Sequence, residues 1–297
     1  MGKLKQYWKG KTLEIKEIDI KSELYPRKLK EIDNPPKKLY IQGNVDLLNK
    51  EALSIIGSRN STEYGERTAK RFAKELSKQG IVIISGMAKG IDSCAHLGAI
   101  EGGGKTIAVL GSGFNYIFPD KEVYEKILES GGAIVTEYEK EVEVFPQGFR
   151  DRNRIVAGMS IATLVIEAKH KSGTSITAGY AKRYDRKLFC IPHTIEDEAG
   201  VGTNRLLKNG AILATSANDI LPYYKNIKKV ENKELIVEIP EEYRVVYEEI
   251  KLEPINVDEI RRIIKKPINE INTMLTMLEL EGFIESIPGN FFRRKEF

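Results

Sequence analysis

The sequence has few of the residues that mark secreted, membrane-spanning or metal-binding proteins. Its two cysteines, Cys94 and Cys190, cannot build a disulfide framework, so we expect both to be reduced and buried. No apolar run approaches the ~18 residues that a membrane span requires. The first residues lack the apolar stretch of a secretory signal, which favours a cytoplasmic location. The three histidines lie far apart in the sequence, and we expect no metal site.

The composition predicts a folded protein of one large or two unequal domains. The 297 residues are 41% hydrophobic and 30% charged, enough to bury a sizeable core. The net charge of +4 decides little, but its distribution is uneven. Residues 1–40 hold eleven Lys or Arg against six Asp or Glu, whereas residues 241–297 hold nine against twelve. Because nucleic-acid binders concentrate positive charge where they bind, the first two thirds is the better candidate for such binding.

Short apolar runs recur along the first two thirds of the chain. They are continuous rather than alternating, as expected of parallel strands that are covered on both faces. Between the first two runs, Ala69, Phe72, Ala73 and Leu76 have the spacing of one helical stripe facing a sheet. The pattern therefore predicts a doubly wound α/β domain with a mostly parallel sheet. The runs are residues 53–57, 81–85, 106–111, 133–137, 163–167 and 188–192.

The two ends of the chain follow different patterns. Residues 1–24 are basic and weakly patterned, and we expect an extended arm. Residues 225–240 are polar and end in a proline, which is typical of a linker. Residues 241–297 show three helical segments followed by a hairpin that turns at Pro288, Gly289 and Asn290. Three helices and a hairpin predict a winged helix-turn-helix domain.

Small, glycine-rich and hydroxyl-bearing segments follow several of the predicted strands. In an open parallel sheet, ligands bind outside the carboxyl ends of the strands. Glycine lets backbone N–H groups approach a ligand, the start of a helix attracts anions, and arginine matches a phosphate. Together these segments predict an anion-binding edge; the alternative is that the glycines only serve tight turns. The segments are residues 57–60, 85–92, 111–113 and 169–175.

Residues 149–160 concentrate three arginines, Arg150, Arg152 and Arg154, behind Phe149. Alternate residues do not share one face of a helix, so we expect this segment to enter its helix from an extended turn. Such a turn aims guanidinium groups at successive phosphates, while Phe149 stacks on a base. The alternative is a solvated basic turn with Phe149 in the core.

Other motifs are weaker. The GGGKT segment at 102–106 has the wrong spacing for a phosphate loop and precedes a strand, so we expect a turn there. The glycine fingerprint of dinucleotide binding is absent. Asp92 and His96 lie one helical turn apart, and a salt bridge at the start of a helix is favoured over a metal site.

Seven segments, taken together and in order, resemble the DprA/Smf family of bacterial DNA-processing proteins. The resemblance covers roughly residues 25–224, and residues 271–294 are similar to the family's C-terminal winged helix. It implies an extended Rossmann fold that binds single-stranded DNA, protects incoming strands in natural transformation and loads RecA recombinase past single-strand-binding protein. It also implies a homodimer, no cofactor and no catalysis. The segments are YPRKLKEIDNPPKKLYIQGN, IIGSRNSTEYG, ISGMAKGIDSCAHLGAI, GGKTIAVLGSGFNYIFP, FRDRNRIVAGMS, KSGTSITAGYA and GTNRLLKNGAIL.

The resemblance and the loop chemistry together give a set of candidate DNA- and phosphate-binding residues. The wider spacing of FPQGFRDRNR leaves Phe145 or Phe149 as the stacking aromatic. His193, where the family usually has glycine after proline, is expected to reshape that loop. The candidates are Gly57, Ser58, Arg59, Ser85, Gly86, Lys89, Gly90, Lys121, Phe149, Arg152, Asn153, Arg154, Ser172, Gly173 and Thr174.

Two other functions use the same fold. A phosphoribohydrolase would need a catalytic glutamate where this chain has Thr177, and Glu137 or Glu167 would have to replace it. A small-nucleotide sensor would use the same edge of the sheet without the arginine-rich segment. In the tail, the predicted third helix, residues 267–282, has no basic residue, and Arg293 to Lys295 lie on the wing. We therefore favour a protein-contact or regulatory role for the winged helix over recognition of duplex DNA.

Overall fold

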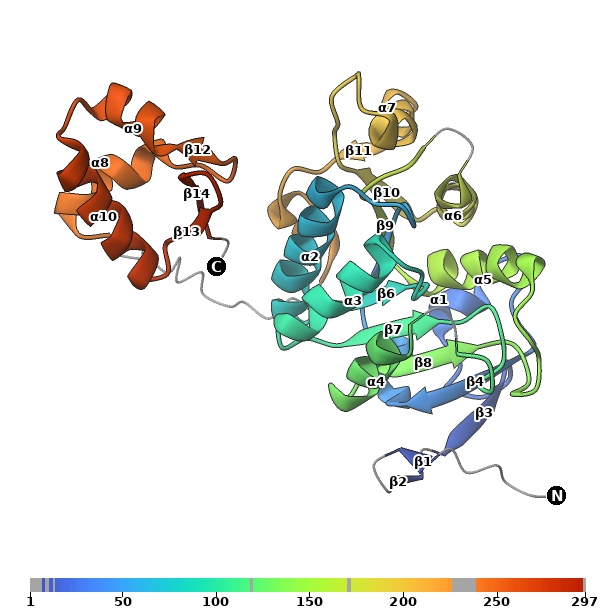
Figure 1. The fold of residues 1–297 in the computed structure, drawn as a ribbon. Helices are drawn as coiled ribbons and strands as arrows, with labels where there is room; N and C mark the ends of the chain where they lie inside the picture. The colour runs from blue at the N-terminus through green and yellow to red at the C-terminus, as the bar shows by residue number, and fades with distance from the viewer. Residues whose placement is uncertain are drawn as a thin grey trace. The chain divides into compact units, whose positions relative to one another are not determined.

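A computed structural model describes residues 7–8, 11–12, 14–117, 120–169, 172–225 and 239–295. The chain divides into two compact units, residues 1–230 and 231–297, each with its own core (Figure 1). The expected linker, residues 225–240, lies mostly outside the described residues. No helix in the described part of the chain has the length and apolar character needed to cross a membrane.

A nine-stranded sheet organises the first unit, in the order β11-β10-β9-β5-β6-β7-β8-β4-β3. Strands β5 to β11 run parallel, whereas β4 pairs antiparallel with β8 and β3 antiparallel with β4. All six predicted strands are present, and the doubly wound α/β fold is confirmed. The strands are β3 (Ile15–Asp19), β4 (Lys38–Gly43), β5 (Ala52–Ile56), β6 (Val82–Ser85), β7 (Thr106–Val109), β8 (Ala133–Thr136), β9 (Ala162–Val165), β10 (Lys187–Cys190) and β11 (Ile212–Leu213).

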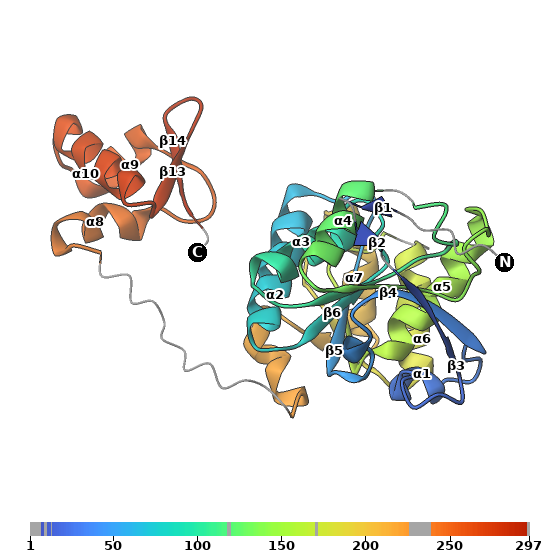
Figure 2. The same cartoon turned by 90° about the horizontal axis from the view of Figure 1, so that it is seen from below.

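Helices cover both faces of this sheet, which explains why its central strands are continuously apolar (Figure 2). One layer packs on the core that contains Leu29, Val156 and Ala178. It consists of α1 (Arg27–Lys30), α5 (Pro146–Met159), α6 (Gly173–Arg183) and α7 (Val201–Lys208). The opposite layer packs on the cores that contain Phe72, Ala95 and Ile127. It consists of α2 (Glu63–Lys78), α3 (Ile91–Glu101) and α4 (Lys121–Glu129).

Helix α2 shows how the sequence sets these elements. The side chain of Thr62 caps its first turn by accepting a hydrogen bond from the N–H of Gly65. The predicted stripe from Ala69 to Leu76 is buried against the sheet. Gly80 follows with φ +90°, a conformation that suits glycine at the end of a helix.

Strands β3, β4 and β11 were not predicted. In β4 only Leu39 and Ile41 alternate as fully buried apolar residues, so the strand lacks the continuous run of the parallel strands. Strand β3 is mostly exposed and lies within the segment expected to be an N-terminal arm. Two further strands in that segment, β1 (Tyr7–Trp8) and β2 (Lys11–Thr12), pair with each other. Short 3₁₀ helices complete the unit at Val45–Asn49, Glu198–Gly200, Ala217–Asp219 and Leu221–Tyr223.

The second unit is a winged helix, as predicted. Its helices pack Val246, Ile260 and Leu275 into one core. Asn256 caps the second helix by accepting a hydrogen bond from the N–H of Asp258, and the hairpin turns at Gly289 and Asn290, both with positive φ. The elements are α8 (Glu241–Glu249), β12 (Ile255–Asn256), α9 (Val257–Ile264), α10 (Ile268–Leu280), β13 (Ile284–Ile287) and β14 (Phe291–Arg294).

The strand order reverses between β5 and β9. The chain runs from β5 outward to β6, β7 and β8, then returns through α5 to place β9 on the other side of β5. The loops after β5 and β9 therefore diverge toward opposite helix layers. This is the position where doubly wound sheets bind ligands.

Candidate nucleic-acid interface

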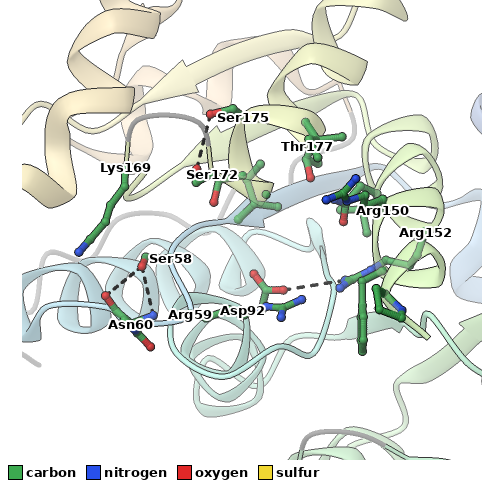
Figure 3. A pocket seen from close by; sticks show the side chains of 18 of the residues that line it. Ser58, Arg59, Asn60, Asp92, Arg150, Arg152, Lys169, Ser172, Ser175 and Thr177 are labelled. Atoms are coloured by element: carbon green, nitrogen blue, oxygen red, sulfur yellow. Dashed lines mark hydrogen bonds and ion pairs between the residues drawn. The ribbon is translucent and has the colours of Figure 1, made fainter. Parts of the chain in front are cut away.

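A pocket of about 1050 Å³ opens at this reversal point. Its walls come from the loops after β5 and β9, the start of α3, and the first turns of α5 and α6 (Figure 3). Among the described residues that line it are four cations and one carboxylate, so the wall is strongly positive. The charged residues are Arg59, Arg150, Arg152, Lys169 and Asp92.

Arg152 forms the floor of the pocket. Its side chain is only 5% exposed and reaches from α5 over Gly86, filling the space that a Cβ atom on Gly86 would need. Burial lowers the pKa of the Arg152 guanidinium; the carboxylate of Asp92 opposes this, while the charge of Arg59 adds to it. The glycine at position 86 therefore leaves room for the side chain of Arg152.

Asp92, which sequence reasoning treated only as a partner of His96, holds the loop after β6. One carboxylate oxygen, Oδ2, accepts hydrogen bonds from the N–H groups of Gly86 (3.2 Å) and Ala88 (3.3 Å). The same oxygen lies 3.9 Å from Nη1 of Arg152. The expectation that the amides around Gly86 face a phosphate is thus wrong, because these amides face Asp92.

The predicted partner of Asp92, His96, makes no salt bridge. Its Nδ1 donates to the hydroxyl of Thr106 (2.6 Å), which donates in turn to the carbonyl of Ile83. Burial lowers the pKa of His96 to about 3, so the ring is neutral. Within the described residues no cluster of three or more His, Cys, Asp or Glu side chains could hold a metal ion.

Both candidate aromatics line the pocket but differ in their contacts. The guanidinium of Arg59 lies over the ring of Phe149, 5.1 Å from its centroid. Phe145 packs edge-on against Tyr138 with ring centroids 5.4 Å apart. Phe149 therefore lies beside a cation of the pocket, whereas Phe145 packs against another aromatic ring.

The start of α6 forms the opposite wall. Ser172 precedes the helix, and its hydroxyl is 3.5 Å from that of Ser175. No acidic residue lies in the first turn, which leaves the positive end of the helix dipole uncompensated there. The hydroxyl of Thr174 donates to the carbonyl of Gly57 and ties this wall to the loop after β5. Gly173 is open, with nothing near its Cβ position.

The loops after β5 and β6 are also tied together. The N–H of Ile91 donates to the carbonyl of Ser58, and a Cβ atom on Gly90 would meet that same oxygen. Gly57 lies against the side chain of Ile91 without room for a Cβ. The hydroxyl of Ser58 bonds within its own turn, to the backbone of Asn60. These predicted residues shape the loop that presents Arg59.

Arg154, predicted as a phosphate contact, is buried away from the pocket. Its Nη1 and Nη2 atoms each lie 2.6 Å from an oxygen of Glu137, and its Nε donates to the carbonyl of Asn34. The extended turn expected before the helix is absent, because α5 already begins at Pro146. The three arginines therefore leave one helix in different directions. Arg150 and Arg152 line the pocket with Asn153, but Arg154 does not.

Three further candidates lie outside the pocket lining. Ser85 is fully buried and donates to the carbonyl of Ile55, so its role is structural. Lys89 is exposed in the loop before α3. Lys121 begins α4, its side chain is 76% exposed, and its Nζ lies 3.9 Å from Glu125. Neither lysine is among the residues that line the pocket.

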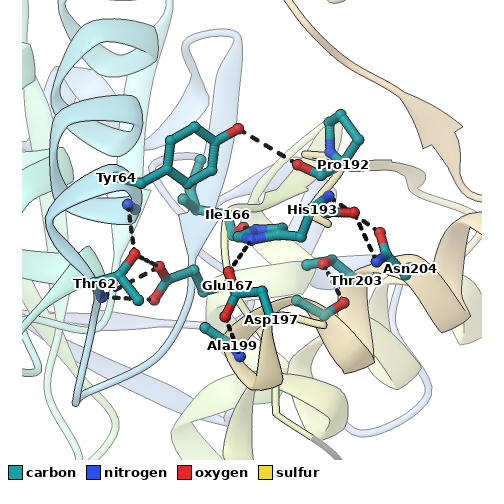
Figure 4. A network of polar contacts seen from close by, with 12 residues as sticks. Thr62, Tyr64, Ile166, Glu167, Pro192, His193, Asp197, Ala199, Thr203 and Asn204 are labelled. Atoms are coloured by element: carbon teal, nitrogen blue, oxygen red, sulfur yellow. Dashed lines mark hydrogen bonds and ion pairs between the residues drawn. The ribbon is translucent and has the colours of Figure 1, made fainter. Parts of the chain in front are cut away.

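The carboxylates that a hydrolase would require are used elsewhere. Glu137 pairs with Arg154, and the fully buried Glu167 accepts hydrogen bonds from the backbone and hydroxyl of Thr62 (Figure 4). Thr177 lines the pocket where the hydrolase pattern requires glutamate.

His193, the departure noted in the sequence, lies in the loop after β10. The ring is buried, with Nδ1 3.0 Å from a carboxylate oxygen of Asp197 and Nε2 2.8 Å from the carbonyl of Ile166. It fastens the loop to the end of β9 (Figure 4).

The arginines of the wing are engaged within their own domain. Arg293 pairs with Glu285, and Arg294 lies over the ring of Tyr247, 4.2 Å from its centroid. A second basic group, in which Arg261, Arg262 and Lys265 are exposed at the end of α9, was missed by the sequence analysis. The described surface of α10 presents no basic side chain.

A doubly wound sheet with a cationic pocket at its reversal point, followed by a winged helix, defines a class of α/β proteins that carry a second, winged-helix module. Comparison with known proteins narrows this class. The model for DNA recombination-mediator protein A matches residues 16–225, and that for the DprA winged helix domain matches residues 235–290. The chain belongs to the DprA/Smf family.

Relatives support this assignment along most of the chain. Protein Smf of Escherichia coli is 33% identical over 290 residues, covering 93% of this chain and 76% of its own length. DNA processing protein DprA of Bacillus subtilis is 36% identical, covering 69% and 70%. The structure of DprA from Streptococcus pneumoniae matches with a TM-score of 0.67 and 35% identity, covering 71% of this chain and 75% of the other. That of DNA processing protein A from Helicobacter pylori, described with its single-stranded DNA binding mode, gives 0.64 and 31%, covering 72% and 98%.

Proposed function

We propose that this chain binds single-stranded DNA without regard to sequence, through the pocket at the reversal point. The observation that carries the proposal is the set of four cations facing a single carboxylate, with Phe145 and Phe149 in the same wall. Cations bind the sugar-phosphate chain, and aromatic rings stack on any base. The related DNA processing protein A of Helicobacter pylori is described with its single-stranded DNA binding mode, which supports single-stranded DNA as the ligand.

Arg59 is the contact best suited to a test, because its guanidinium lies at the pocket beside Phe149. Arg59→Ala should weaken binding of fluorescent oligo-dT about tenfold, the cost of one charged hydrogen-bonded contact. The loss should be equal for a mixed-sequence oligonucleotide, since phosphates carry no sequence information. Arg67→Ala, which removes a half-exposed arginine of α2 outside the pocket lining, is the matched control. A wild-type chain that ignores oligo-dT at low salt contradicts the proposal.

We further propose that the chain acts as a homodimer, protects incoming strands during natural transformation and loads RecA recombinase onto DNA coated by single-strand-binding protein. Support comes from membership in a family of recombination mediators. The test is the lag before RecA hydrolyses ATP on coated single strands. The wild-type chain should shorten this lag, and Arg59→Ala should not.

The proposed activity breaks no bond. In the described part of the pocket the single carboxylate, Asp92, accepts hydrogen bonds from two amides and lies 3.9 Å from Arg152, which disfavours a phosphoribohydrolase. Incubation with AMP should release no adenine. Release that is lost in Asp92→Asn would establish the hydrolase instead.

A further inference from the structure

The floor of the pocket holds a charged pair that is close but not bonded. Nη1 of Arg152 and Oδ2 of Asp92 are 3.9 Å apart, beyond hydrogen-bond distance. The Nε of Arg152 is buried and has no hydrogen-bond partner. Buried polar groups are nearly always satisfied in folded proteins, so a missing partner points to a ligand. The side chains are 5% and 11% exposed, respectively, and both line the pocket.

Asp92 puts an anionic oxygen where a phosphate oxygen would otherwise be expected. Its Oδ2 collects the N–H groups of Gly86 and Ala88, which belong to the loop that follows β6. In comparable loops of other folds, such amides and a nearby arginine are the groups that hold phosphate. Here the carboxylate of Asp92 already accepts hydrogen bonds from these amides, while the Nε of Arg152 still has no partner.

The charges at the floor do not balance. The charge of Arg59 acts on the guanidinium of Arg152, and both line a pocket whose one described carboxylate is Asp92. One further negative charge would neutralise the group. An internal phosphodiester carries one such charge and has oxygens that can accept from Arg152.

We propose, on the basis of the proposed function, that Asp92 is an internal counter-ion that limits the affinity of the pocket for the DNA phosphate bound by Arg152. When a strand enters, a phosphate oxygen accepts from Arg152, and the carboxylate then lies beside an anion. The like charge weakens binding relative to a neutral residue at the same place. Asp92 thus stabilises the empty pocket and favours release of the strand. It is a positioning residue that tunes affinity rather than a direct ligand.

Asp92→Asn separates charge from shape, because an asparagine oxygen can still accept from Gly86 and Ala88. We expect the variant to bind oligo-dT at least about threefold more tightly than wild type, in a fluorescence anisotropy titration. Arg152→Gln should bind more weakly, and in the Arg152→Gln background Asp92→Asn should give no gain. Glu101→Gln removes a charge from the other end of α3 and is the matched control; it should leave affinity unchanged.

A second variant with the opposite expected effect on affinity keeps the proposal testable if Asp92→Asn fails to fold. Asp92→Glu lengthens the side chain toward Arg152, so it should complete the ion pair and weaken binding of oligo-dT. Thermal denaturation with inorganic phosphate provides a second readout, since a ligand of the native state raises Tm. Phosphate should raise Tm more in Asp92→Asn than in wild type.

Equal or weaker binding by folded Asp92→Asn, or a gain that persists without Arg152, would overturn the counter-ion role. In both cases wild type still binds oligo-dT, so the proposed function stands. If wild type itself fails to bind oligo-dT, the proposed function has failed and the counter-ion role with it.

Discussion

The guanidinium of Arg152 occupies the space in which Gly86 would carry a Cβ atom. Gly86 does not have a positive φ, so its backbone conformation does not require glycine. What requires it is the arginine that crosses above it from α5. Two segments far apart in the sequence are therefore fitted to each other at the floor of the pocket.

Gly86→Ala should displace Arg152 and weaken binding of oligo-dT about tenfold, as loss of one charged contact would. Anisotropy titrations measure the loss, and circular dichroism checks the fold. Gly179→Ala, on α6 with open space around its Cβ position, is the matched control and should leave affinity unchanged. Unchanged binding by Gly86→Ala would show that moving Arg152 away from Gly86 does not change the affinity for DNA.

Arg154 should matter for stability rather than for DNA. Its pair with Glu137 is largely buried, with side-chain exposures of 10% and 15%. Arg154→Met leaves a buried carboxylate unpaired, which should cost about 3–5 kcal/mol of unfolding free energy in urea. Adding Glu137→Gln should recover much of that loss. A folded Arg154→Met protein with weakened DNA binding would contradict this assignment.

Phe149 and Phe145 should likewise differ: the first should matter for DNA binding and the second for stability. Phe149→Ala should cost about 1–3 kcal/mol of binding free energy for oligo-dT, because a base loses its stacking surface. Phe145→Ala should mainly lower Tm, since Phe145 packs on Tyr138. The reverse result would make Phe145 the stacking residue.

His96 should make the fold sensitive to acid. Its folded pKa is about 3, because burial disfavours the charged ring, whereas an unfolded histidine has a pKa of ~6.5. As the pH falls from about 6.5 toward 3, the unfolded chain gains a proton that the native state lacks. Stability should therefore drop by up to about 1.4 kcal/mol per pH unit over this range.

Urea denaturation between about pH 4.5 and about pH 7.5 measures this dependence. His96→Gln keeps a donor for Thr106 but cannot titrate, so its pH slope should be shallower than that of wild type. Equal slopes would show that His96 is not responsible.

The sequence predicts the strands that are buried on both faces, but it does not predict the strands that are partly exposed. The six central strands have helices on both faces and read as unbroken apolar runs. Near this edge, β3 exposes Lys16 and Glu17 beside the buried Ile18, and β4 places the half-buried Tyr40 between Leu39 and Ile41. Local patterns cannot show that such a segment will pair with β8.

For the site, the sequence predicts the parts but not their roles. It identifies Arg59, Arg152 and Phe149, which do meet in one pocket. Arg152 and Arg154 look equivalent in the sequence. Because α5 already begins at Pro146, one reaches the pocket and the other pairs with Glu137. That choice depends on a partner 17 residues away in the sequence, which no motif contains. The role of Asp92 was missed for the same reason.

The loops after β5 and β9 lead to opposite helix layers, so a strand bound in the pocket would contact both layers. The pocket takes Arg59 and Asp92 from the layer of α2 and α3, and Arg152 and Lys169 from the layer of α5 and α6. A strand that contacts both sets would add to the few direct contacts between these layers, such as Arg152 to Asp92 and Thr174 to the carbonyl of Gly57. Amide hydrogen exchange should then slow in α3 and α5 together when oligo-dT is added, as in a single cooperative unit.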